Sequence, residues 1–227
     1  MATQYKNLID GKMVGTDKNL DVVNPATEEV IGLVPACGKD ELDTAVAAAR
    51  RAFKTWSKTS MDERRDAIKA IAGALNDNSE ELYRLLTSEQ GKPHEQAKGE
   101  IMGAAYMAAT QAGLDLDDEM VQDDEKESIR TRRVPVGVVG GIVPWNFPMP
   151  IAGWAIGPAL AAGNAVVLKP AELTPLTAIR LAELALAAGL PEGVLQVLPG
   201  KGSVVGQRFV SHPGVGKVVF TGSTQVG

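Results

Sequence analysis

The sequence predicts an α/β protein whose second half is a Rossmann-like parallel sheet with flanking helices. Two observations carry this prediction: strand and helix patterns alternate regularly from residue 134 onward, and the strand segments are near-continuous apolar runs. Apolar runs without polar alternation indicate strands buried on both faces, as in parallel sheets. Because parallel crossovers are almost always right-handed, the sheet should be doubly wound. Strands are expected at 134–145, 164–170, 194–200 and 217–223, and helices at 151–163, 174–189 and 203–212.

The first half begins with short strands. Asp10-Gly11 separates two short apolar runs and predicts a tight hairpin, because glycine accepts a positive φ. A second pair of strands is expected on either side of the turn at Asn24-Pro25.

Four helices follow the strands. Apolar residues from Leu42 to Trp56 recur at three- and four-residue spacing and form one stripe. Ser60 and Glu63 have the spacing of a capping box, and Asn78 is expected to cap the next helix. An Ala-rich helix from about 95 to 112 completes the set. We assign these helices to the scaffold.

Composition excludes several classes of function. The 227 residues are 44% hydrophobic and 22% charged, as in packed globular proteins, and the net charge is -5. An acidic chain is a poor partner for nucleic acid, and no apolar run approaches the ~18 residues of a membrane span. Without a signal peptide at its start, the chain is expected to be cytoplasmic. One cysteine, Cys37, and two histidines provide neither a disulfide nor a zinc site.

The segment between the two halves is strongly charged. Eight acidic residues lie between Asp115 and Glu127, and three arginines follow. From the residues alone a solvated loop is favoured. The alternative is a β-ribbon that pairs with another subunit, because the alternation at 129–133 suits a strand exposed on both faces.

Four strands of the predicted sheet end in the segments PWNFP, KPAE, PGKG and TGS. Since ligands bind at the carboxyl ends of such strands, these segments should converge on one crevice. The dinucleotide fingerprint G-x-G-x-x-G is absent, because Gly137, Gly140 and Gly141 have a different spacing. Structural alternatives are a rigid loop around a packed tryptophan, a surface ion pair between Lys169 and Glu172, and glycines that only cap helices.

Taken together, the motifs resemble the aldehyde dehydrogenase superfamily. The resemblance is carried by VPWNFPMP at 143–150, GPALAAGNAVVLKPAELTP at 157–175, AGLPEGVLQVLPG at 188–200 and FTGSTQVG at 220–227. NPATEEVIG, EQGKP and AKGE extend it over essentially the whole chain. The segment EQGKPHEQAKGEI is most similar to the succinate-semialdehyde dehydrogenase branch.

The resemblance implies a role for each motif. The family oxidises an aldehyde with a cysteine nucleophile, transfers hydride to NAD(P)+ and releases the acid through a water activated by glutamate. Asn146 would be the oxyanion donor. The cofactor would contact Ile142, Val143, Pro144 and Trp145 near the nicotinamide, Lys169 and Glu172 at the ribose hydroxyls, Gly202 and Gly206 near the adenine, and Gly222 and Ser223 at the pyrophosphate.

Glu172 also bears on the choice of cofactor. A carboxylate that accepts from both ribose hydroxyls favours NAD+, because NADP+ would place a phosphate beside it. The resemblance therefore predicts a preference for NAD+, with NADP+ as the other candidate. Metal is not expected in the site.

The resemblance also predicts how the chain is divided. Residues 1–116 would be the strands and helices that begin the cofactor-binding domain, 117–135 an oligomerisation ribbon, and 136–227 a Rossmann-like core that is incomplete at its C-terminus. The catalytic domain would be absent, together with the nucleophilic cysteine and the general-base glutamate. Cys37, between a strand and a helix of the first half, is expected to be a buried or idle thiol.

The chain is therefore expected to be the inactive amino-terminal part of an aldehyde dehydrogenase that is a homo-oligomer when intact. The substrate would be an aldehyde, with a semialdehyde as one candidate. A rival from another class is a non-catalytic module for nucleotide binding or association. A third is a reductase relative such as the acyl-phosphate reductases, although PWNFP and KPAE together favour the dehydrogenases.

Overall fold

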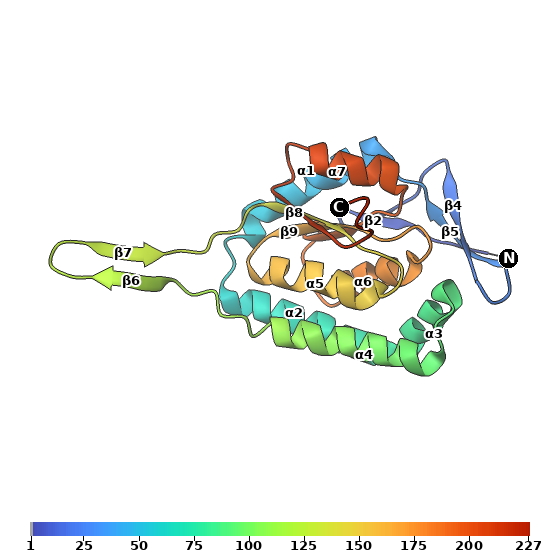
Figure 1. Ribbon diagram of the computed structural model, residues 1–227, viewed down its shortest axis with the longest axis horizontal. Helices are drawn as coiled ribbons and strands as arrows, with labels where there is room; N and C mark the ends of the chain where they lie inside the picture. The colour runs from blue at the N-terminus through green and yellow to red at the C-terminus, as the bar shows by residue number, and fades with distance from the viewer. Residues whose placement is uncertain (1) are drawn as a thin grey trace.

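A mixed six-stranded sheet forms the centre of the computed structural model, which describes residues 2–227 (Figure 1). Its strands are β2 (Asn7–Ile9), β3 (Lys12–Val14), β8 (Val138–Ile142), β9 (Ala165–Lys169), β10 (Leu195–Val197) and β11 (Lys217–Phe220). The order is β11-β8-β9-β10-β2-β3, in which the first four strands are parallel and β2 and β3 are antiparallel. The predicted parallel sheet is confirmed, and the hairpin of the first half extends it.

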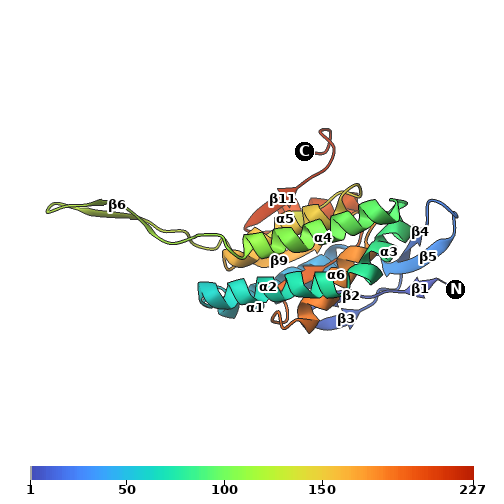
Figure 2. The same ribbon diagram turned by 90° about the horizontal axis from the view of Figure 1, so that it is seen from below.

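Helices cover both faces of this sheet (Figures 1 and 2). One face carries α1 (Lys39–Trp56) and α7 (Gln207–Ser211), which continues from the π-helix η1 (Gly202–Gly206). The other carries α5 (Pro148–Ala161) and α6 (Leu176–Ala187). An outer layer on α5 and α6 consists of α2 (Met61–Asp77), α3 (Ser79–Gln90) and α4 (His94–Gln111).

The strand β9 shows why the apolar runs do not alternate. All five of its residues are buried. Ala165 and Val167 pack in the core beneath α1, whereas Val166 and Leu168 pack in the core beneath α5 and α6. Because successive side chains point to opposite faces, a strand between two layers of helices needs apolar residues at every position.

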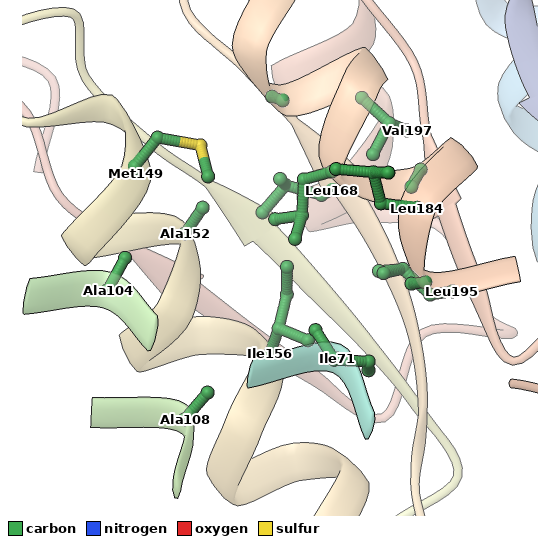
Figure 3. Close-up of a cluster of buried hydrophobic side chains, with 14 of the residues drawn as sticks. Ile71, Ala104, Ala108, Met149, Ala152, Ile156, Leu168, Leu184, Leu195 and Val197 are labelled. Carbon is green, nitrogen blue, oxygen red and sulfur yellow. The ribbon is translucent and has the colours of Figure 1, made fainter. Parts of the chain in front are cut away.

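The larger core lies between the sheet and the helices α2, α4, α5 and α6. Figure 3 shows part of it, where Ile156 of α5 faces Leu168 of β9 and Ala104 and Ala108 of α4 approach α5. Small residues on α4 allow this close approach of two helices. Met149 is also part of this core and is only 1% exposed.

The predicted turns and caps are confirmed with one exception. Asp10 and Gly11 turn the β2–β3 hairpin with φ values of 53° and 72°. Ser60 and Glu63 form the capping box: Glu63 N donates to Ser60 Oγ at 3.2 Å, and Ser60 N donates to Glu63 Oε2 at 2.7 Å. Asn78 is the N-cap residue of α3 as predicted, but its side chain forms no capping hydrogen bond, because its Nδ2 donates back to Ala74 O at 2.8 Å and closes α2.

Two small sheets lie outside the central one. Strands β1 (Thr3–Gln4), β4 (Asn19–Val23) and β5 (Val30–Pro35) form a sheet in the order β1-β5-β4. The acidic segment forms an antiparallel ribbon of β6 (Glu119–Asp123) and β7 (Ser128–Thr131), which projects from the body (Figures 1 and 2). The solvated loop that the residues alone favoured is therefore wrong. Pairing of this ribbon with another subunit stays a prediction.

Complementary charges explain part of the composition of this ribbon. Arg130 lies 3.6 Å from the carboxylate of Asp118, and Arg133 lies 4.0 Å from that of Glu119. Exposed pairs of this kind contribute little free energy, but they favour the ribbon's register over like-charge contacts. Within residues 2–227, no helix is long and apolar enough to cross a membrane.

Glu89, near the end of α3, is a buried carboxylate that ties α3 to the start of α6. Its oxygens accept from Leu176 N at 2.6 Å, Thr177 N at 3.1 Å and Thr177 Oγ1 at 2.5 Å. Burial raises the pKa of Glu89 to about 7, the three hydrogen bonds oppose that rise, and the charge of Glu100 adds to it. Glu89 thus anchors α6, a helix of the second half of the chain, to α3 in the first half.

We expect Glu89→Gln to lower the free energy of unfolding by about 1–3 kcal/mol, because the amide turns an amino group toward a buried donor. The matched control is Glu81→Gln on the same helix, which removes an exposed pair with Arg180 and should cost about 0–1 kcal/mol. Urea denaturation of the purified protein measures both. Equal small effects would contradict the anchoring role of Glu89.

The same pair of variants tests the raised pKa. Because the folded state binds the Glu89 proton more tightly than the unfolded state, stability from this group is present at low pH and is lost as pH rises through about 7. The margin in unfolding free energy of the wild type over Glu89→Gln should therefore shrink from about pH 5 to about pH 8. A margin that grows over this range would show that the pKa of Glu89 is lowered instead.

Candidate functional site

Three parallel strands end in register at one edge of the central sheet. Ile142 at the end of β8 pairs with Lys169 of β9 on one side and with Phe220 of β11 on the other. Hydrogen bonds continue past the ends, from Val143 N to Lys169 O and from Thr221 N to Ile142 O, both at 3.1 Å. The segments PWNFP, KPAE and TGS therefore begin at the same level, as predicted, whereas no residue of the fourth segment, PGKG, lines the cleft that they form.

An open cleft of about 700 Å³ lies at this edge. Nine of the eleven residues predicted for the site line it. Apolar residues beyond the prediction, Ala171, Leu173, Phe220 and Val226, complete the lining together with Thr221. The nine predicted residues are Ile142, Val143, Pro144, Trp145, Asn146, Lys169, Glu172, Gly222 and Ser223.

Lys169 brings an ammonium group to the cleft from a buried strand. The residue is 4% exposed, and its Nζ donates to Pro170 O at 2.8 Å. Burial lowers the pKa of Lys169, and the nearby charge of Glu172 opposes this effect. An ammonium group has three N–H donors, and within residues 2–227 one of those of Lys169 is used, in the bond to Pro170 O. The group can therefore donate to an oxygen of a ligand.

Glu172 is held in place by the start of η1. Gly202 N donates to Glu172 Oε1 at 2.9 Å, which leaves Oε2 and further lone pairs for a ligand. Among the described residues, Glu172 and Lys169 form no ion pair, so the surface ion pair considered above is wrong. Gly202 thus reaches the cleft through Glu172, although it does not line it.

Gly206 lies on η1 beside the end of β8. A Cβ at this position would come within 3.8 Å of Ile142 Cδ1, so η1 runs close to the strand. The closeness depends on Gly140 in β8, where a Cβ would lie 2.5 Å from the ring of Phe209 on α7. The glycines of VVGGI therefore serve helix-on-sheet packing, and the predicted helix start at 203 is a π-turn at 202–206.

Gly222 and Ser223 form the turn after β11. A Cβ on Gly222 would collide with the Phe220 ring, which lines the cleft. Ser223 O accepts from Val226 N and Gly227 N, each at 3.1 Å, so the segment 223–227 is a single turn. Glycine at 222 is accordingly required by packing against the Phe220 ring, and the turn lines the cleft.

The loop at 144–147 presents its side chains outward. Trp145 is 54% exposed and lines the cleft, so a loop built around a packed tryptophan is wrong. Asn146 is exposed, and no hydrogen bond to its side-chain amide is formed by residues 2–227. Its backbone is held, because Gln90 and Lys92 donate to Asn146 O.

A second open pocket of about 750 Å³ lies on the other side of this loop. Phe147 and Trp154, both more than half exposed, line it with Met107 of α4. Trp154 of α5 lies in this pocket, whereas Met149 of the same helix is packed in the core and does not line it.

Cys37 is a buried thiol, as predicted. It is 4% exposed, and Asn7 Nδ2 donates to its Sγ at 2.7 Å. Burial, with a contribution from the charge of Glu41, raises the pKa of Cys37 to about 12, and the hydrogen bond from Asn7 opposes the rise. Cys37 does not line the cleft. No group of three metal-ligating side chains is present in residues 2–227.

Parallel strands, glycines close to the strand ends and a cleft with one ammonium and one carboxylate define a nucleotide-binding class of site. The particular family follows from comparison: the sequence model of the aldehyde dehydrogenase family matches residues 13–227, and the chain belongs to this family. Phenylacetaldehyde dehydrogenase of Pseudomonas fluorescens is 44% identical over 98% of the chain and 47% of its own length. The mitochondrial aldehyde dehydrogenase of Leishmania tarentolae is 43% identical over 99% and 46%.

Solved structures agree with this assignment. An NAD+ complex of aldehyde dehydrogenase from Bacillus cereus has a TM-score of 0.96 and 37% identity, covering 99% of the chain and 47% of that structure. An NADP-dependent enzyme of E. coli has a TM-score of 0.95 and 38% identity, covering 99% and 48%. The chain thus spans about half the length of the relatives it matches, and of these the Bacillus cereus structure names NAD+ and the E. coli structure names NADP.

We expect Cys37 to resist alkylation by iodoacetamide at about pH 8 in the folded protein, because so little thiolate is present there. Mass mapping of the peptide that contains Cys37 should show no modification after an exposure that labels it fully in denaturant. Rapid labelling in the folded state would show that the thiol is accessible and ionised.

Proposed function

We propose that the chain is the cofactor-binding part of an NAD(P)-dependent aldehyde dehydrogenase that oxidises an aldehyde to a carboxylic acid. The observation that carries the proposal is the cleft in which Asn146, Lys169 and Glu172 meet the glycine turn at 222. Cys37 is the single cysteine of residues 1–227 and is buried. The nucleophilic cysteine of the reaction would therefore come from outside these residues, and the resemblance places the general-base glutamate there as well.

The residues of the cleft fit a dinucleotide. Lys169 offers unused donors and Glu172 offers unused lone pairs, which suit the hydroxyls of a ribose. Gly222 and Ser223 line the cleft at the turn after β11, where the pyrophosphate would lie, and apolar Ile142 and Val143 suit the face of a ring. When bound, the nicotinamide cofactor accepts the hydride that leaves the aldehyde carbon. The chain's own residues orient it.

Asn146 is suited to stabilise the oxygen of the reacting aldehyde. Its side-chain amide is exposed between the cleft and the second pocket and is a neutral donor at any pH. A donor aimed at developing negative charge on oxygen contributes about 3 kcal/mol of transition-state stabilisation. The fixed backbone of the loop supports this role, because a donor must be in position before the charge develops.

The second pocket suits the body of the aldehyde. Phe147, Trp154 and Met107 give it an apolar lining. A semialdehyde would place its carboxylate near Lys92, the cation of this lining, whose charge is already paired with Glu100. We therefore propose an aldehyde with an apolar body, and succinate semialdehyde is the alternative to which EQGKPHEQAKGEI points.

Glu172 favours NAD+ over NADP+. Because Gly202 N holds the carboxylate at 2.9 Å, a 2′-phosphate would meet a fixed negative charge. At ~4 Å and an effective dielectric of ~20, two unit charges repel by roughly 4 kcal/mol, and solvent screening reduces this. The positive charge of Lys169 offsets a further part of this repulsion.

We expect Asn146→Ala to lower kcat about 10²–10³-fold, because it removes one oxyanion donor. NADH formation is measured with phenylacetaldehyde and with succinate semialdehyde on an intact enzyme that contains residues 1–227 together with the part that supplies the nucleophile. Asn19→Ala, a change at an exposed strand residue, is the control and should leave kcat unchanged. An intact wild-type enzyme that oxidises neither aldehyde contradicts the proposed function, and a faster rate with the semialdehyde reverses the preference for an apolar body.

We expect Glu172→Ser to raise the ratio of kcat/KM with NADP+ to kcat/KM with NAD+ by tenfold or more, which corresponds to about 1.4 kcal/mol. Glu125→Ser in the exposed ribbon turn changes the net charge equally and should leave the ratio unchanged. Initial rates with each cofactor measure the ratio. An unchanged ratio in Glu172→Ser would remove this residue from cofactor selection.

A further inference from the structure

The backbone of the loop that carries Asn146 is held by the last residue of α3. Gln90 Nε2 donates to Trp145 O at 3.1 Å and to Asn146 O at 2.7 Å. The orientation of this amide follows from its partners, because two carbonyl oxygens require the amino group to face them. One side chain thus spans two successive peptide units of the loop.

Lys92, in the corner between α3 and α4, is a second side chain that binds the backbone of this loop. Its Nζ donates to Asn146 O at 3.1 Å, lies 4.2 Å from the centroid of the Phe147 ring and is paired with the carboxylate of Glu100. The side chain of Lys92 is 11% exposed and that of Glu100 is 1% exposed. A charge-assisted contact at this depth is only weakly screened by solvent.

Glu100 of α4 completes the arrangement at the far end of the loop. Its second oxygen accepts from Met149 N at 3.2 Å, at the start of α5. The loop is therefore held at 145, 146 and 149 by side chains from the first half of the chain. The side-chain amide of Asn146 has no partner within residues 2–227, so the backbone is fixed while the functional group stays available.

We propose that Gln90 and Lys92, supported by Glu100, are positioning residues that set the orientation of the Asn146 amide toward the aldehyde oxygen. The inference rests on the proposed function, since it assigns Asn146 to the oxyanion. None of the three side chains needs to touch the reacting atoms. Their effect arises because a displacement of about 1 Å at a catalytic group can lower the rate about 10²-fold.

A double-mutant cycle between Gln90 and Asn146 tests the proposal. Gln90→Leu keeps the size of the side chain and removes both donors to the loop. In the wild-type background we expect it to lower kcat about tenfold or more, with the KM for NAD+ changed less than about twofold. In the Asn146→Ala background, it should change kcat by less than about twofold, because no amide is left to position.

A structural role predicts another pattern. If Gln90 only stabilised the fold, Gln90→Leu would lower kcat by the same factor in both backgrounds, and that outcome overturns the proposal. The matched control is Gln4→Leu, which also removes donors to backbone carbonyls, Tyr5 O and Leu33 O, but far from the loop. It should leave kcat unchanged. These measurements use the intact enzyme that contains residues 1–227 and the nucleophile. An intact wild-type enzyme without activity overturns the proposed function as well, whereas an active one with equal factors overturns only the positioning role.

A second variant covers the case in which Gln90→Leu does not fold, as judged by circular dichroism. Lys92→Met combined with Glu100→Gln removes the buried pair together, so that no single charge is left unpaired. It should lower kcat about tenfold in the wild-type background and less than about twofold with Asn146→Ala. Equal losses of kcat in both backgrounds overturn the proposal here too.

Discussion

Two buried glutamates in the outer helices position the loops on which the candidate site depends. Glu100 of α4 accepts from Met149 N at the start of α5, and Glu89 of α3 accepts from Leu176 N and Thr177 N at the start of α6. Each of these helices directly follows a loop that lines the cleft. A carboxylate at a helix N-terminus satisfies free amides and interacts favourably with the helix dipole. The two loops are therefore fixed at the points where they become helical.

The two halves of the chain are consequently not independent in the structure. The hairpin β2–β3 extends the sheet next to β10, and α1 buries the sheet face that α7 also covers. Residues 89–100 contact the loops at 145–149 and the start of α6. Elements that look like plain scaffold in the sequence therefore determine the geometry of the cleft, and a change at the α3–α4 corner acts on the site through the backbone.

The sequence predicted the sheet and the place of the cleft because those features depend on local patterns. Continuous apolar strands, such as the one ending at Lys169, indicate burial on both faces, and parallel strands share one carboxyl edge. The roles of Glu89, Gln90 and Glu100 could not be predicted, because acidic and amide residues at a helix surface look alike whether their partners are solvent or amides distant in the chain. From the residues alone the ribbon of β6 and β7 was only the alternative to a loop, because its charges suit both a loop and a two-sided exposed strand, whereas the resemblance predicted a ribbon at 117–135.

The candidate site lacks the G-x-G-x-x-G fingerprint, and the glycines of β8 instead bring backbone close to the cleft through helix packing. In G-x-G-x-x-G the glycines lie in the phosphate loop, where they allow a tight turn and close approach. Here Gly140 lies within the strand and admits the ring of Phe209, so that α7 and η1 lie close on the sheet. That closeness brings Gly202 N to Glu172 and Gly206 beside Ile142. A side chain at position 140 would push α7 outward and so move Gly202 N, the amide that holds Glu172. Neither Gly202 nor Glu172 is near position 140 in the sequence.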